Sequence, residues 1–346
     1  MGFDEKLKST DPREADEALS DFINYTLDDL HSGFSLPSWM TGQDFDHSGE
    51  GFAYALSMRH DIEYRQARQK AYPDGLLCYE EVGNTAYITF DEFIAGMPFA
   101  YYMDPDVSVT NKMDEISLSD MLNFNPDPNE RDLEDSAAGE SQAEGPEAEE
   151  EEEMPASIAV DTERLIIEAH KRVTRKDSPI ENVVIDLSCN GGGEADAAIF
   201  ALGWFMGDTE VSSCNTFTGA LSSAVYRADV NLDRKFDDSD TVRDKHLYCL
   251  ISPSSFSCGN LLPSVFKNSQ DVTLIGKTSG GGSCVVRPLS TASGTLFQIS
   301  GPNRLAFTKN GSFYNIDQGM EPDVYIDDID HYYDREALTE FINNIY

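Results

Sequence analysis

The first 75 residues and the rest of the chain differ in their pattern of hydrophobic positions. Apolar side chains recur every three or four residues over 16–30 and again over 51–71, which predicts two amphipathic helices. The stretch Tyr72-Pro-Asp-Gly75 is typical of a turn. We therefore expect a small helical region at 1–75, followed by a larger domain at 76–346.

From Leu76 onward, short apolar runs of strand length alternate with segments of helical spacing. The runs 76–82 and 85–90 flank Gly83-Asn84, which predicts a β-hairpin. Further strands are expected to begin at Val183, Leu247 and Leu274, and further helices are expected at 158–175, 195–206 and 261–267. This alternation of strands and helices predicts an α/β fold.

One segment, 104–157, interrupts this alternation. It is rich in Asp, Pro, Asn, Ser and Glu, and it contains the acidic run Glu149-Glu-Glu-Glu-Glu153. A segment of this composition cannot bury enough apolar surface to fold alone. We therefore expect a disordered acidic insertion in the larger domain.

The charge of the chain limits its partners. Asp and Glu number 63 against 25 Lys and Arg, which gives a formal net charge of −38. Such a surface repels nucleic acid and anionic membranes, so we exclude both as partners, and it weakly favours cationic or neutral peptides. The sequence contains no apolar run of about 18 residues, the length a membrane span needs. Because Met1 is not followed by the apolar segment of a signal peptide, we expect a cytoplasmic location, or an extracytoplasmic one if a segment precedes this sequence.

Three turns of small residues follow three of the predicted strands. They are Asn190-Gly-Gly-Gly193, Ser252-Pro-Ser-Ser-Phe-Ser-Cys-Gly-Asn260 and Lys277-Thr-Ser-Gly-Gly-Gly282. The second turn leads into a predicted helix for which Asn260 is the expected cap, so the first amides of that helix could bind an oxyanion. We expect the three turns to converge on one cleft. The six cysteines show neither the spacing of a zinc site nor a CxxC pair, and we expect no metal and no cofactor.

The order of these motifs, completed by Gly319-Met-Glu-Pro-Asp323, resembles the tail-specific (C-terminal-processing) serine peptidases of family S41. The resemblance covers about residues 76 to 330. It implies an α/β catalytic core of the ClpP/crotonase kind. It also implies a serine-type endopeptidase that acts on peptide or unfolded protein through an acyl-enzyme, without a cofactor.

The resemblance assigns the reactive groups of the second turn. It places the nucleophile at Ser257, ahead of Ser254 and Ser255. The backbone N–H of Cys258 would be one oxyanion donor, and the N–H of Gly191 or Gly192 would be the other.

A serine nucleophile needs a base, and two branches of the family supply different ones. In an ungapped comparison the lysine of one branch falls on Gly282, so this chain departs from that branch. The other branch, similar to the tricorn protease core, uses a histidine from the N-terminal part. Asp29-Leu-His-Ser-Gly-Phe34 resembles its motif and makes His31 the expected base. His60 is a rival, but its neighbour Asp61 would not face it on a helix.

Several readings stay open. The group that orients His31 could be Ser32, Asp317 or Glu321, of which we prefer Asp317. Residues 229–240 place oxygen ligands as in a calcium loop but lack its glycine, so an acidic turn is the alternative. The whole chain could also be a catalytically inactive S41-like protein that binds a peptide or an apolar ligand. A crotonase-like acyl-CoA enzyme would need a basic patch near the glycine loops, and the sequence shows none.

Overall fold

The computed structural model describes residues 3–36, 52–95 and 157–345, which belong to one compact unit. Nearly all of the predicted acidic insertion at 104–157 lies outside these described residues. Within them, no helix combines the length and hydrophobicity needed to cross a membrane.

A six-stranded sheet forms the centre of this unit, in the order β13-β8-β7-β4-β3-β2. Neighbouring strands are parallel, apart from the antiparallel pair β2 and β3 that forms the predicted hairpin. The middle strands are buried along almost their whole length, which explains their nearly continuous apolar sequences. The strands are β2 (Tyr79–Val82), β3 (Thr85–Thr89), β4 (Asn182–Asp186), β7 (His246–Ile251), β8 (Val272–Gly276) and β13 (Val324–Tyr325).

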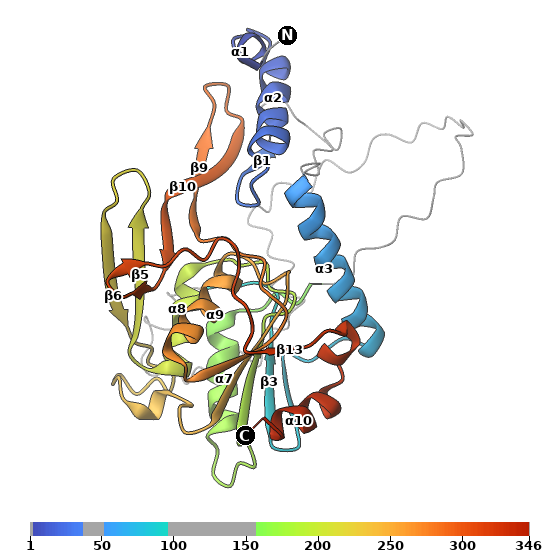
Figure 1. Cartoon of the computed structure of the whole chain (residues 1–346), viewed down its shortest axis with the longest axis vertical. Helices are drawn as coiled ribbons and strands as arrows, with labels where there is room; N and C mark the ends of the chain where they lie inside the picture. Colours follow the sequence, from blue (N-terminus) through green and yellow to red (C-terminus); the bar gives the residue numbers. More distant parts are fainter. Residues whose placement is uncertain (1–2, 37–51, 96–156, 346) are drawn as a thin grey trace, which may run out of the picture. The chain divides into compact units, whose positions relative to one another are not determined.

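Helices cover both faces of this sheet (Figure 1). Val183 and Leu247 point to the face covered by α7 (Thr162–Val173), α8 (Ala195–Met206) and α9 (Cys258–Ser269). Val184 and Tyr248 point to the opposite face, where α3 (Phe52–Ala71) and α10 (Arg335–Asn343) pack. Because side chains alternate along a strand, adjacent residues enter different apolar layers. This arrangement confirms the predicted α/β class.

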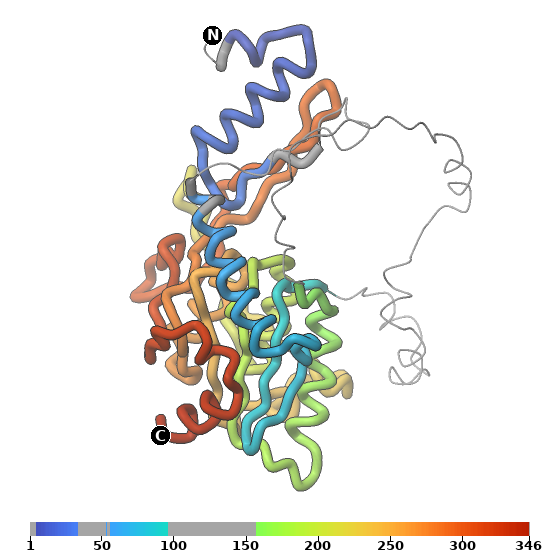
Figure 2. The backbone as a smooth tube through the Cα atoms, turned by 90° about the vertical axis from the view of Figure 1, so that its right-hand side faces the viewer, coloured from blue at the N-terminus to red at the C-terminus, as the bar shows by residue number. Residues whose placement is uncertain are grey.

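A second, five-stranded sheet connects the N-terminal region to the last third of the chain. Its long strand β10 (Leu296–Ala306) pairs with β1 (Gly33–Leu36) on one edge and with β9 (Cys284–Ser290) on the other. Figure 2 shows the β9–β10 hairpin beside the N-terminal segment. The pairing Gly33–Gln298 carries His31 to strands that lie more than 250 residues later in the chain.

The other elements of the described residues are short or peripheral. They are α1 (Phe3–Lys6), α2 (Pro12–Asp21), the π-helix η1 (Phe22–Leu27), β5 (Thr209–Asn215), β6 (Leu221–Tyr226), the 3₁₀-helices η3 (Asp238–Asp240) and η4 (Ile329–Tyr332), β11 (Thr308–Lys309) and β12 (Ser312–Phe313).

Predicted boundaries were wrong for three helices. The helix expected at 158–175 spans Thr162–Val173, because Asp161 caps it by accepting the Arg164 N–H at 2.9 Å. The first long helix ends at Leu27 rather than at residue 30, because Asp28 takes a left-handed conformation with φ 44° and its carboxylate accepts the Ala53 N–H at 2.9 Å. His31 therefore precedes a strand rather than ending a helix. At α9 the N-cap residue is Ser257, not Asn260, whose amide lies inside the helix and donates to the Gly282 and Ile316 carbonyls.

In the acidic segment 229–240, carboxylates accept hydrogen bonds from backbone N–H groups of the same segment. Asp240 accepts the N–H groups of Val230 and Asn231, and Asp229 accepts the N–H of Arg234. The described part of the chain contains no cluster of three or more His, Cys, Asp or Glu residues able to hold a metal ion. These backbone contacts are what the acidic-turn reading expects.

Candidate active site

Ser257 occupies a strained turn between β7 and α9. Its backbone has φ 56° and ψ −117°, a combination that costs a residue other than glycine about 1–3 kcal/mol. The turn is held because the Ser257 N–H donates to the Gly281 carbonyl at 2.9 Å and the Ser257 carbonyl accepts the Leu261 N–H at 2.8 Å. A sharp strand-to-helix turn of this kind presents the central side chain at the start of the helix.

The neighbouring serines have different environments. The Ser255 hydroxyl donates to the Leu187 carbonyl at 2.6 Å and accepts the Ser252 N–H at 2.9 Å, so it stabilises the turn. The Ser254 hydroxyl is buried and has no partner among the described residues. Ser257 is half-buried, and its side chain makes no capping bond to α9. Of the three, Ser257 is the one whose side chain is neither buried nor bonded to the turn among the described residues.

The first glycine loop lies directly against Ser257. A Cβ atom at Gly192 would lie 2.7 Å from the Ser257 Cβ and 3.2 Å from its Oγ. Gly192 also has φ 116°, which only glycine adopts without strain. This position therefore needs glycine on two grounds, and the close approach puts loop backbone beside the Ser257 hydroxyl.

Two of the predicted oxyanion donors already donate to other groups of the protein. The Gly191 N–H donates to the Asp91 carbonyl at 3.0 Å, and the Gly192 N–H donates to Asn190 Oδ1 at 3.0 Å. Two other N–H groups near Ser257 have no acceptor among the described residues, those of Gly193 and Cys258.

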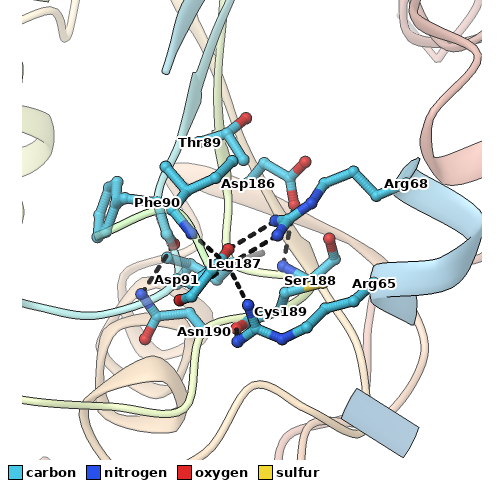
Figure 3. A network of polar contacts seen from close by, with 12 residues as sticks. Arg65, Arg68, Thr89, Phe90, Asp91, Asp186, Leu187, Ser188, Cys189 and Asn190 are labelled. Atoms are coloured by element: carbon cyan, nitrogen blue, oxygen red, sulfur yellow. Dashed lines mark hydrogen bonds and ion pairs between the residues drawn. The ribbon is translucent and has the colours of Figure 1, made fainter. Parts of the chain in front are cut away.

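A buried ionic network fixes the glycine loop to α3 (Figure 3). The Asp91 carboxylate accepts hydrogen bonds from Arg68 at 2.6 and 2.7 Å and from Arg65 at 2.6 Å. Arg65 also reaches the Cys189 carbonyl at 3.4 Å. Since Asp91 and Arg68 are only 3% and 4% exposed, each depends on the other to compensate its buried charge.

His31 is brought to the same region by β1. Its ring packs on Phe256, the residue before Ser257, with 4.5 Å between ring centroids. The His31 Cε1 atom lies 2.8 Å from where a Cβ at Gly282 would stand. No hydrogen bond joins His31 to Ser257 within the described residues, and the buried Nε2 of His31 has no partner there. The imidazole thus adjoins the Ser257 turn without a bond to its hydroxyl.

The other ring nitrogen of His31 is engaged. Nδ1 lies 2.9 Å from the Cys284 Sγ. The backbone of His31 is also fixed, because its N–H donates to Asp29 Oδ1 at 3.1 Å and its carbonyl accepts from Gln298 at 3.1 Å. Burial lowers the pKa of His31 below its usual 6.5, while the Asp29 charge raises the pKa and the Arg304 charge lowers it further.

The three side chains predicted to orient His31 make other contacts. Asp317 forms an ion pair with Arg304 and accepts the Ser283 hydroxyl at 2.5 Å. The Ser32 hydroxyl donates to Asp29 at 3.0 Å, and Glu321 is exposed. None of these three bonds to the His31 ring within the described residues. The rival base His60 lies 3.7 Å from Glu63 on α3.

Cys284 is the contact of His31 that sequence reasoning missed. It lies two residues beyond the second glycine loop, where it begins β9. In the sequence nothing distinguishes Cys284 from the other five cysteines, because only the pairing of β1 with β10 brings His31 to it. Its place two residues after Gly280-Gly281-Gly282 was the available signal.

A cleft of about 330 Å³ borders the glycine loop. One wall is formed by Gly191 to Gly193 together with Phe256. Leu30, next to His31, and α3 residues that include Asp61 also line the cleft. An extended chain lying in this cleft would pass beside the turn that carries Ser257.

These features match a known family. The model for peptidase family S41 fits residues 154–326, which is half of the chain. The chain belongs to peptidase family S41. Its fold and membership support a peptidase function.

The chain is also similar to individual proteins, in sequence or in fold. A protein from Chlamydia pneumoniae is 30% identical over 142 residues, 35% of this chain. The structure of a lipoprotein from Streptococcus agalactiae covers 99% of this chain and 87% of its own at 11% identity, with a TM-score of 0.52, a likeness of fold. The photosystem II D1 C-terminal processing protease is 18% identical over 49% of this chain, with a TM-score of 0.39. The chain spans 21% of the Chlamydia protein and 40% of the D1 protease.

Proposed function

We propose that this protein is a serine endopeptidase in which Ser257 is the nucleophile and His31 is the general base. The observation that carries the proposal is the strained backbone of Ser257 at the start of α9, with Gly192 pressed against its side chain. Strained backbone conformations are found most often at functional sites, where the surrounding structure holds them in place. Here the Gly281 carbonyl and the first turn of α9 maintain it.

The reaction would proceed by acyl transfer. The Ser257 oxygen attacks a peptide carbonyl while its proton passes to His31 Nε2. The protonated imidazole then gives that proton to the leaving amine as the C–N bond breaks, which leaves an ester on Ser257. Water then attacks the ester while His31 again acts as the base. This step releases the carboxylic acid product and restores the free Ser257 hydroxyl.

The oxyanion would be bound by backbone N–H groups of Cys258 and Gly193. We favour Gly193 over Gly191 and Gly192 because the latter two N–H groups already donate, to the Asp91 carbonyl and to Asn190 Oδ1. The Cys258 N–H is the first of α9, where the helix dipole also favours negative charge. Removing one oxyanion donor typically costs about 2.7–4 kcal/mol of transition-state stabilisation.

The base is assigned to a histidine because Gly282 has no side chain. The lysine of the other family branch would fall at that position, and here the His31 ring fills the adjoining space. The thiol next to Ser257 is a poor nucleophile, because burial raises the pKa of Cys258 to about 12 and keeps the thiol protonated at neutral pH.

The substrate would be a peptide or an unfolded protein segment. The cleft beside the glycine loop supports this assignment, because it lies between the Ser257 turn and α3 and is open enough for a chain. The net charge of −38 further favours neutral or cationic segments over acidic ones.

The alternative is a catalytically inactive S41-like protein that binds a peptide or an apolar ligand. One observation favours it, namely that His31 Nε2 has no bond to Ser257 among the described residues. Such a protein would hold a peptide in the cleft and release it uncut.

Cleavage of a denatured protein by the full chain separates the two functions. Wild type should produce fragments, and Ser257→Ala should produce none while keeping the same circular dichroism spectrum. Ser264→Ala, a buried serine of the same helix, is the matched control and should cleave like wild type. Equal cleavage by Ser257→Ala would remove Ser257 from its role, and bound but intact substrate with wild type would support the inactive alternative.

A further inference from the structure

Resting on this proposed function, we propose that Cys284 is a positioning residue for His31, and that it connects the imidazole through Ser300 to the carboxylate of Asp29. The thiol thereby takes the place in which Ser32, Asp317 or Glu321 was expected.

Four polar groups form a continuous chain. His31 Nδ1 lies 2.9 Å from Cys284 Sγ, and that sulfur lies 2.9 Å from the Ser300 hydroxyl. The Ser300 hydroxyl donates to Asp29 Oδ2. The groups come from the turn before β1, from β9 and from β10, so the pairing of these strands assembles the chain.

Asp29 is held rigidly at the end of this chain. Its Oδ1 accepts the His31 N–H at 3.1 Å, and its Oδ2 accepts the Ser32 hydroxyl at 3.0 Å. Ser32 in turn accepts the Ser300 N–H at 3.1 Å. The carboxylate thus fixes the position of the histidine backbone as well as the far end of the contact chain.

The ionised carboxylate sets the direction of every proton along this chain. Asp29 can only accept, so Ser300 donates its single proton to it. The Ser300 oxygen is then free to accept from the Cys284 thiol, and the Cys284 sulfur accepts from Nδ1–H of His31. This leaves the lone pair of the neutral imidazole on Nε2, which is the tautomer that a general base needs.

The thiol and the surrounding charges suit this role. Burial raises the pKa of Cys284, and a protonated thiol is what the chain of donors requires. The charged groups that act on His31 are Asp29, which favours the imidazolium, and Arg304 on β10, which opposes it. Arg304 is itself paired with Asp317. A neutral thiol stabilises the imidazolium less than a carboxylate in direct contact would. The main effect of Cys284 is therefore on the tautomer and orientation of the His31 ring.

The test compares Cys284→Ala with Cys284→Ser in the full chain. At metal sites, loss of the group that orients a ligating histidine lowers metal affinity or activity by about 10- to 100-fold. We expect a fall of that size in kcat for Cys284→Ala, with little change in KM. Cys284→Ser keeps one donor and one acceptor and should recover most of the rate. Cys214→Ala, a half-buried thiol of β5, is the control that should match wild type.

A spectroscopic readout tests the positioning independently of turnover. Nitrogen-15 NMR of His31 should report a proton on Nδ1 in wild type and in Cys284→Ser, and a mixture of tautomers in Cys284→Ala. If the wild-type protein does not cut the denatured substrate, the proposed function fails. The NMR measurement still decides whether Cys284 positions His31. A wild-type tautomer and rate in Cys284→Ala, or equal damage by alanine and serine, would overturn the positioning role.

Discussion

A Cβ atom at position 282 would lie 2.8 Å from Cε1 of His31, so Gly282 leaves the space that the imidazole occupies. Gly282 also has φ 81°, a conformation open to glycine. Its neighbour Gly281 accepts the N–H of Ser257. The second glycine loop therefore contacts both proposed reactive residues, and it accommodates a base that comes from the other end of the chain.

Gly282→Ala should lower kcat by about a hundredfold, because the new methyl group displaces the His31 ring and small displacements of reacting groups are costly. Steady-state cleavage of a fluorogenic peptide measures this change. Gly33→Ala is the control, since a Cβ there meets no atom within 4 Å. A rate within twofold of wild type for Gly282→Ala would show that the ring position is irrelevant to turnover.

The pH profile should show an acid limb with a midpoint below 6.5. Burial lowers the pKa of His31 below that value, so the imidazole stays neutral and able to accept a proton at pH values where a free histidine is half charged. kcat/KM should be constant above the midpoint and fall as the pH drops through it. Asp29→Asn removes the charge that favours the imidazolium, so it should move the midpoint to still lower pH. A midpoint above 6.5 contradicts His31 as the base.

Asp91→Ala should lower the free energy of unfolding by about 3–5 kcal/mol, because it removes the carboxylate that accepts two hydrogen bonds from the buried Arg68 guanidinium. Urea denaturation followed by circular dichroism measures the change. The control is Lys70→Ala, which removes an exposed pair with Asp330 and should leave the midpoint unchanged. Equal midpoints for both variants would show that the Asp91 network does not anchor α3.

Ser257→Gly should be more stable than Ser257→Ala by roughly 1 kcal/mol. Glycine adopts φ 56° and ψ −117° without the strain of about 1–3 kcal/mol, and it loses part of that gain through the greater freedom of its unfolded chain. Both variants should be inactive. Urea midpoints that favour alanine would mean that the Ser257 backbone is not strained.

The α/β core could be predicted because its determinants are local. Buried strands such as β4 and β7 are nearly continuous apolar runs, and helices α3 and α8 matched their expected ranges within a residue. The first helix ended early because Asp28 turns into the left-handed region to meet Ala53, a contact that helical spacing does not reveal.

The surroundings of His31 depended on contacts between distant segments. Cys284 reaches the ring only because β1 and β9 pair with opposite edges of β10. Asp317 was a reasonable choice from its motif, but Arg304 and Ser283 bind its carboxylate. Side-chain partners of this kind are set by strand register, and the sequence pattern did not fix the position of β1.

The most direct measurement of the central claim is covalent labelling by a fluorophosphonate probe, with the modified residue located by mass spectrometry. The account predicts one adduct, on Ser257, formed much more slowly in His31→Ala and at the wild-type rate in His60→Ala. Labelling on another residue, or labelling of Ser257 at a rate that does not depend on His31, would contradict it.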